Sequence, residues 1–189
     1  MKKALLLLAA TGLLQAAENQ GVTIAYLKDH QDLIPQVVDI WYSGQKNLPV
    51  KPTEGMTAAL KEHCNIDKLK MCLIALENGE AIGMIRLVDV WTKDPETSPW
   101  IAAHPEITPW VCGLIIKESH RRRGIGHQLV NAVKENATKL GYNALYLGAD
   151  DEYKEIYAKH NCQVIAETTF RGDPTTIMEY AIPQKTLTN

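Results

Sequence analysis

The sequence has few cysteines and no excess of charge of either sign. Its 4 cysteines in 189 residues form no C-x-x-C pair and are too scattered for a disulfide scaffold, so buried free thiols are expected. The 20 Lys and Arg residues nearly balance the 22 Asp and Glu residues, so the basic surface that general nucleic-acid binding needs is not expected. A hydrophobic content of 46% excludes a disordered chain.

The apolar segment near the N-terminus is too short to span a bilayer, which takes ~20 residues. It runs from Ala4 to Leu14, after a basic start and before small residues, which is the arrangement of a secretory signal peptide. We therefore predict export to the periplasm or the medium, with residues 1–20 as the signal. The alternative is an N-terminal helix on a cytoplasmic protein. Residues 21–189 suffice for one core and are expected to form a single domain.

From Gly21 onward, short strands alternate with helices. Apolar and β-branched runs predict strands at 22–27, 71–77, 81–90, 110–116, 144–148, 163–170 and 176–182. Apolar residues at helical spacing predict helices at 32–43, 56–63, 124–140 and 152–160. The prolines between 91 and 109 predict a long loop without regular structure. The pattern is typical of an α/β domain with a mixed sheet.

The segment with the clearest chemistry joins the strand at 110–116 to the helix at 124–140, and it reads Arg121-Arg122-Arg123-Gly124-Ile125-Gly126. Its two glycines let backbone amides approach a ligand closely. The start of a helix favours an anion, and arginine side chains suit phosphate oxygens. The segment therefore predicts a phosphate or diphosphate site.

Alternative roles for residues 121–126 fit the sequence less well. A Walker loop would continue into Gly-Lys-Ser/Thr, which is absent, and a dinucleotide fingerprint would have glycine at Leu129. A solvated basic turn would need no glycines. Nucleic-acid binding would need a basic face, which the balanced charge does not provide.

Residues 121–126 resemble the acetyl-CoA diphosphate loop of the GNAT superfamily of N-acetyltransferases, whose pattern is Gln/Arg-x-x-Gly-x-Gly/Ala. The order of the predicted elements from Val22 to Ile182 is similar to that family as well. The resemblance implies a central, mostly antiparallel sheet that is splayed between two strands and flanked by helices. It also implies that acetyl-CoA is the co-substrate and that its thioester enters the gap between those strands.

The resemblance also implies roles for individual residues. Diphosphate binding falls to the backbone amides of Arg121, Arg122, Arg123, Gly124, Ile125 and Gly126. The pantetheine is expected to lie along Leu114, Ile115 and Ile116. Tyr157 matches the family tyrosine that protonates the departing thiolate. The family commonly continues with glycine and an aromatic residue, where this chain has Asn161 and Cys162; asparagine tolerates the left-handed conformation needed there.

The general base is assigned to Asp89. It alternates with Ile85 and Leu87, so its carboxylate would share their apolar strand face, and desolvation would raise its pKa. The alternative is that Asp89 ends the strand and caps the following loop. His104, Glu106 and Glu118 are rival bases.

Aromatic residues are candidates for the acceptor site. Trp41, Trp91 and Trp110 are expected to shape it, although plain hydrophobic packing explains them equally well. The histidines show no metal-ligand spacing, so no metal is expected. Cys112 has no evident histidine partner, which disfavours a covalent intermediate.

These observations predict an acetyl-CoA-dependent N-acetyltransferase in which a primary amine of a small molecule or a protein attacks the thioester directly. Backbone N–H groups would stabilise the oxyanion. A homodimer is compatible with the sequence. The alternatives are a CoA- or nucleotide-binding module without transferase activity and an NADP-dependent oxidoreductase.

Overall fold

Seven strands pair into one mixed sheet in the part of the chain that the computed structural model describes, residues 21–44, 53–159 and 161–182. The strands are β1 (Val22–Tyr26), β2 (Met71–Glu77), β3 (Glu80–Val88), β4 (Trp110–Ile116), β5 (Ala144–Ala149), β6 (Cys162–Phe170) and β7 (Asp173–Ala181). Their order across the sheet is β1-β2-β3-β4-β5-β7-β6, and only the β4–β5 pair is parallel. The mostly antiparallel sheet confirms the predicted fold class.

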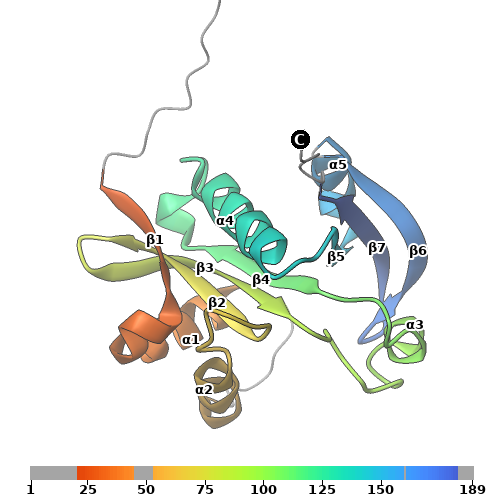
Figure 1. The fold of residues 1–189 in the computed structure, drawn as a ribbon, viewed down its shortest axis with the longest axis horizontal. Coiled ribbons are helices and arrows are strands. Elements are labelled where there is room, and N and C mark those ends of the chain that lie inside the picture. The colour runs from red at the N-terminus through yellow and green to blue at the C-terminus, as the bar shows by residue number, and fades with distance from the viewer. Residues whose placement is uncertain (1–20, 45–52, 160, 183–189) are drawn as a thin grey trace, which may run out of the picture.

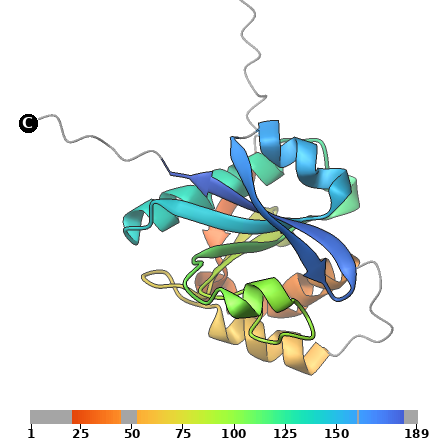
Figure 2. The same ribbon diagram turned by 90° about the vertical axis from the view of Figure 1, so that its right-hand side faces the viewer.

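Helices cover both faces of the sheet. They are α1 (Ile34–Ser43), α2 (Thr53–Glu62), α3 (Pro99–Ala103), α4 (Ile125–Lys139) and α5 (Asp151–Lys159), with 3₁₀ segments η1 (Leu27–Leu33) and η2 (Glu118–His120). In Figure 1, α4 lies above the sheet and α1 and α2 lie below it. The turned view in Figure 2 shows α5 on the side of α4 and α3 on the side of α2.

Helix α4 is held on its face of the sheet by a buried apolar stripe. Ile125, Leu129, Val133 and Ala137 recur at helical spacing, and each is at most 1% exposed. They pack against the residues of β2 and β3 that point to the same face. On the other face, α1 and α2 pack on the intervening residues of these strands. Both faces of the central strands are therefore buried, and α4 is fixed in place.

Strands β4 and β5 meet at a single point. Their only register pair among the described residues is Trp110 with Tyr146, near the start of β4. Because the strands are parallel, the rest of β4 leaves the side of β5 after that pair. This is the splay that the family resemblance implied.

The hairpin between β2 and β3 forms as its Asn-Gly turn predicts. Asn78 and Gly79 both have positive φ, 52° and 82°, as a two-residue hairpin turn of the primed type requires. The turn brings Glu77 opposite Glu80 at the end of the hairpin.

Two local predictions are wrong. The proline-rich segment 91–109 contains helix α3, because Pro99 occupies the first helical turn, where its missing N–H costs nothing. Helix α1 begins two residues later than predicted, after the 3₁₀ segment η1.

The predicted signal peptide, residues 1–20, lies outside the described residues. In the part of the chain that is described, no helix has both the length and the apolar character to cross a membrane.

Candidate active site

The segment 117–126, which we call the arginine loop, turns sharply into α4. Arg122 has a φ of 61°, and Gly124, the N-cap of α4, has a φ of 75°. Alternation of left-handed and ordinary residues turns successive N–H groups toward one side, next to the free amides of the first helical turn. A Cβ atom built on Gly124 or Gly126 would meet nothing within 4 Å. The loop therefore leaves open space for an anionic group.

The side chains of the arginine loop are tied to the protein. The Nη1 and Nη2 atoms of Arg123 donate to the two carboxylate oxygens of Glu77, at 3.3 and 2.5 Å. His120 lies against the same carboxylate, with its Nε2 3.2 Å from Oε2. Arg121 and Arg122 are both exposed, and Arg121 Nε donates to the carbonyl oxygen of Ile116 at 3.2 Å. Glu77 therefore links two positions of the arginine loop, His120 and Arg123, to the end of β2.

The sequence analysis missed Glu77, which lies 46 residues from Arg123. The hydrogen bond from Arg123 is the main cause that holds the pKa of Glu77 below its usual value, and His120 adds to it. The carboxylate is therefore charged at neutral pH. No local motif marks Glu77; only the fold of the β2–β3 hairpin brings it here.

A bulge in β4 lies beside the gap between the strands. Gly113 has a φ of 65°, and the pairing with β3 shifts register between Met84 and Arg86. Two residues of β4 thus oppose one residue of β3, which bends the strand.

The three residues expected to line the pantetheine point to different faces. Leu114 and Ile116 pack on the α4 face. Ile115 is buried on the opposite face, among residues of α1 and α2. Because side chains alternate along a strand, Ile115 could contact a ligand on the α4 face only through its backbone, and the pantetheine position along these three residues stays a prediction.

Tyr157 reaches the place where β4 and β5 part. It packs in one cluster with Val111 of β4, Leu147 and Ala149 of β5, and Met178 of β7. Burial is the largest cause that raises the pKa of Tyr157. The phenol therefore keeps its proton at neutral pH.

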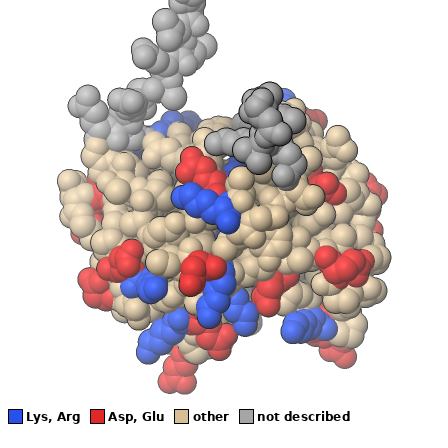
Figure 3. Space-filling view, in the orientation of Figure 1, with Lys and Arg blue, Asp and Glu red and all other residues tan. Residues whose placement is uncertain are grey.

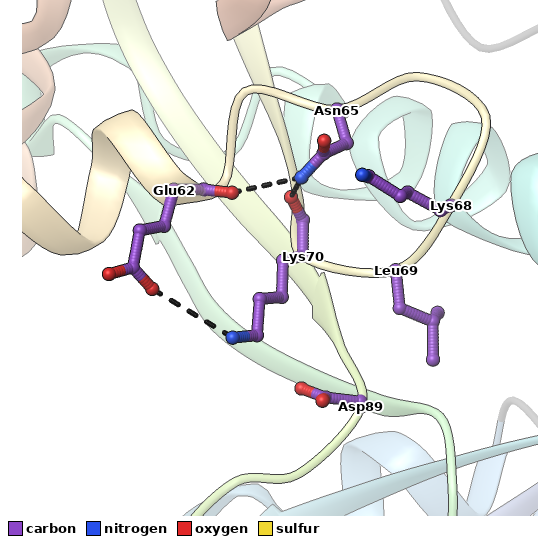
Figure 4. A pocket seen from close by; sticks show the side chains of 6 residues that line it. All are labelled: Glu62, Asn65, Lys68, Leu69, Lys70 and Asp89. Atoms are coloured by element: carbon purple, nitrogen blue, oxygen red, sulfur yellow. Dashed lines mark hydrogen bonds and ion pairs between the residues drawn. The ribbon is translucent and has the colours of Figure 1, made fainter.

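Asp89 is exposed just beyond the end of β3, and its Oδ1 accepts the amide N–H of Val90 at 3.0 Å. It lines an open pocket of about 470 Å³, and Figure 4 shows Lys70 between it and Glu62. The expectation of a desolvated carboxylate is wrong, because the strand ends before Asp89 can join the apolar face. Its role as the base stays a prediction.

The three tryptophans have different surroundings. Trp110 is 1% exposed, and its Nε1 donates to the carbonyl of Ile107 at 2.7 Å. It is therefore a core residue rather than part of an open acceptor site, because its whole ring is packed. Trp91 stacks on Phe170 at 4.3 Å between ring centroids. Trp41 is partly exposed and makes an edge contact with Tyr42.

Charge on the surface is mixed. On the face viewed in Figure 3, basic and acidic side chains lie interspersed rather than gathered by sign. This agrees with the near balance of the whole sequence.

The comparisons with known proteins identify the family. Residues 36–160 match the family model described as acetyltransferase (GNAT) family. The chain belongs to this family. GNAT proteins are acetyltransferases that use acetyl-CoA, so this chain is a transferase with acetyl-CoA as its co-substrate. The predicted family, enzyme class and co-substrate are thereby confirmed, and nothing in the comparisons supports an oxidoreductase.

Solved structures share the fold at low sequence identity. An aminoglycoside 6'-acetyltransferase type Ii is 19% identical, with a TM-score of 0.61 over 86% of this chain and 99% of that one. An aminoglycoside 6'-N-acetyltransferase complexed with coenzyme A is 16% identical, with a TM-score of 0.64 over 86% and 98%. Ard1 from Thermoplasma volcanium is 14% identical, with a TM-score of 0.64 over 87% and 99%. No curated protein sequence matches the chain.

Proposed function

We propose that this GNAT acetyltransferase transfers the acetyl group of acetyl-CoA directly to a primary amine, with both substrates bound at once. The observation that carries the proposal is the parting of β4 from β5 after the Trp110–Tyr146 pair. The arginine loop begins where β4 ends, and Tyr157 packs on the same buried cluster of β5 and β7 residues as Val111 of β4. This arrangement supports an anion site and a proton donor near one gap.

The backbone is proposed to hold the donor. The amides from Arg121 to Gly126 would bind the diphosphate, with the exposed side chains of Arg121 and Arg122 available to its oxygens. Beyond Trp110, the described part of β4 has no register partner in β5. Its N–H and C=O groups can therefore pair with the pantetheine amides. A β4 amide beside the bulge could also stabilise the oxyanion, which is worth ~3 kcal/mol for one well-placed donor.

Tyr157 is proposed as the general acid. A thiolate leaves more easily when a proton is delivered as its bond breaks, and thiols titrate near ~8.5. Because burial raises the pKa of Tyr157, the phenol is present in the form that can donate. Asp89 is retained as the candidate base. Since it is exposed, it would act on the acceptor amine through water.

The test is Tyr157→Phe. Loss of the phenolic proton should lower kcat by about 100-fold, the usual range for a general acid. The dissociation constant for acetyl-CoA, measured by calorimetry, should stay unchanged because the ring still packs. Tyr153→Phe is the matched control, since Tyr153 lies on the same helix and is 44% exposed; its kcat should be that of the wild type.

Two results would contradict the proposal. Unchanged kcat in Tyr157→Phe would remove the tyrosine from the mechanism. A wild-type protein that binds acetyl-CoA but acetylates no amine would instead favour a binding module without transferase activity.

A further inference from the structure

Arg86 lies on the face of the sheet opposite α4, next to the bulge in β4. Its neighbours Ile85 and Leu87 pack under α4, so the side chain of Arg86 projects to the other face. A Cβ atom built on Gly113 would lie 3.3 Å from Arg86 Nε and 3.7 Å from Trp41 Cδ1. The guanidinium and the edge of the tryptophan ring therefore converge on the strand that borders the gap.

The cross-strand neighbours of Arg86 carry no negative charge. In register, Arg86 lies between Cys72 of β2 and Cys112 of β4. Burial is the largest cause that raises the pKa of both thiols, to about 12 for Cys72. Both are therefore neutral at physiological pH and leave the guanidinium uncompensated.

No carboxylate of the described residues lies within ion-pairing distance of Arg86. The nearby Lys70 pairs with Glu62 at 3.8 Å, and Asp89 is exposed beyond the strand end. The Nε atom of Arg86 is fully buried without a hydrogen-bond partner. The neutral thiol of Cys112 contacts the guanidinium but does not balance its charge. A partly buried cation without a carboxylate partner is unfavourable, and such groups concentrate at functional sites. The missing partner is an anion.

We propose that Arg86 binds a carboxylate of the acceptor, so that the acceptor is a small amine that also carries a carboxylate, as an amino acid does. This inference rests on the proposed acetyl transfer. A guanidinium matches a carboxylate with two parallel N–H···O bonds, which fix orientation as well as position. Held beside the Gly113 bulge, the carboxylate would keep the amine close to the gap. Trp41 would cover the apolar part of the acceptor.

The test uses matched pairs of acceptors, the 20 common amino acids and their carboxamides, with the full-length enzyme. The measured quantity is kcat/KM for the amino acid divided by kcat/KM for its carboxamide. For at least one pair, this ratio should be about ten-fold or more lower in Arg86→Gln than in the wild type. Comparing the ratio between wild type and variant cancels the different reactivities of the two amines. The KM for acetyl-CoA should not change. Arg86→Lys should retain part of the preference, since the charge stays but the planar pair of donors is lost.

Lys70→Gln is the control, because it removes a cation that already has the partner Glu62 on the same side of the molecule. It should leave the acid-over-amide ratio unchanged. A second experiment needs no variant: calorimetry measures the dissociation constants of the same acceptor pairs for wild-type protein saturated with CoA. There, at least one amino acid should bind more tightly than its amide.

The outcomes separate the two proposals. If amides or polyamines are bound and acetylated in preference to every amino acid, or if Arg86→Gln lowers both members of each pair equally, the inference about Arg86 is wrong while acetyl transfer stands. If the enzyme binds acetyl-CoA but acetylates no amine at all, both are wrong.

Discussion

The arginine loop and the opposite face of the sheet differ in how their charges are balanced. Beside the loop, the carboxylate of Glu77 pairs with Arg123 and also contacts His120. Near the bulge on the other face, Arg86 has only neutral thiols as its cross-strand neighbours. The charge of Arg123 is thus paired within the chain, whereas Arg86 has no carboxylate partner among the described residues. We infer that the arginine loop binds the donor, acetyl-CoA, and that the face carrying Arg86 binds the acceptor.

The largest expected effect comes from breaking the loop at its left-handed turn. Valine is strained at the φ of 75° found at Gly124. Gly124→Val should weaken acetyl-CoA binding by up to about 100-fold, corresponding to ~3 kcal/mol of strain. The dissociation constant is measured by calorimetry.

Gly172→Val is the control for general strain. Gly172 also has a positive φ, 87°, but it lies in the β6–β7 turn. This variant should lose stability without losing acetyl-CoA affinity. Equal affinity losses in the two variants would mean that the loop has no special role.

The difference between the two regions also explains what the sequence could predict. The arginine loop is a local motif in which glycines, a strand end and a helix start lie within a few residues, so spacing alone indicates its geometry. The long helix at 124–140 and the Asn78-Gly79 hairpin were predictable for the same reason. Each is determined by neighbouring residues.

The features that the sequence did not reveal depend on distant contacts. Glu77 meets Arg123 across 46 residues. In the sequence, Arg86 is an ordinary strand residue. Only the register of the three strands shows that thiols lie on both sides of it. Asp89 was misplaced because alternation along the strand does not show where the strand ends. Trp110 was assigned to the acceptor site because only packing reveals that its ring is buried.

Acid should loosen the face that carries Arg86. Burial is the main cause that lowers the pKa of His63 from 6.5 to about 4, and the charges of Arg86 and Lys70 add to the shift while Asp89 opposes it. The folded state thus binds a proton less readily than the unfolded chain. The stability that neutral His63 provides is complete above pH 6.5 and is lost as the pH falls toward 4.

Urea unfolding can isolate this contribution. Between about pH 7 and about pH 5, the wild type should lose ~2 kcal/mol more unfolding free energy than His63→Gln. Parallel curves for the two proteins would show that His63 titrates normally in the folded state.

A smaller effect is expected from the ion pairs beside the loop. Glu77→Gln should raise the KM for acetyl-CoA by roughly three-fold, because partly exposed ion pairs contribute little. The KM for S-acetylpantetheine, which lacks the diphosphate, should not change. Glu80→Gln, across the same hairpin turn, is the control. If Glu77→Gln raised the KM for acetyl-CoA and for S-acetylpantetheine equally, Glu77 would not act through the diphosphate-binding loop.

A limited effect is also expected at Asp89. Because its carboxylate is exposed and water can replace it, Asp89→Asn should lower kcat by less than about ten-fold. Glu96→Gln, an exposed change in the following loop, serves as the control. A loss as large as that of Tyr157→Phe would show that the carboxylate contacts the acceptor directly.

The most direct measurement is a crystal structure of the protein with bound acetyl-CoA. Our account predicts the diphosphate on the amides of residues 121–126 and the thioester between β4 and β5, within reach of Tyr157. A donor bound elsewhere, or β4 and β5 paired along their whole length, would contradict it.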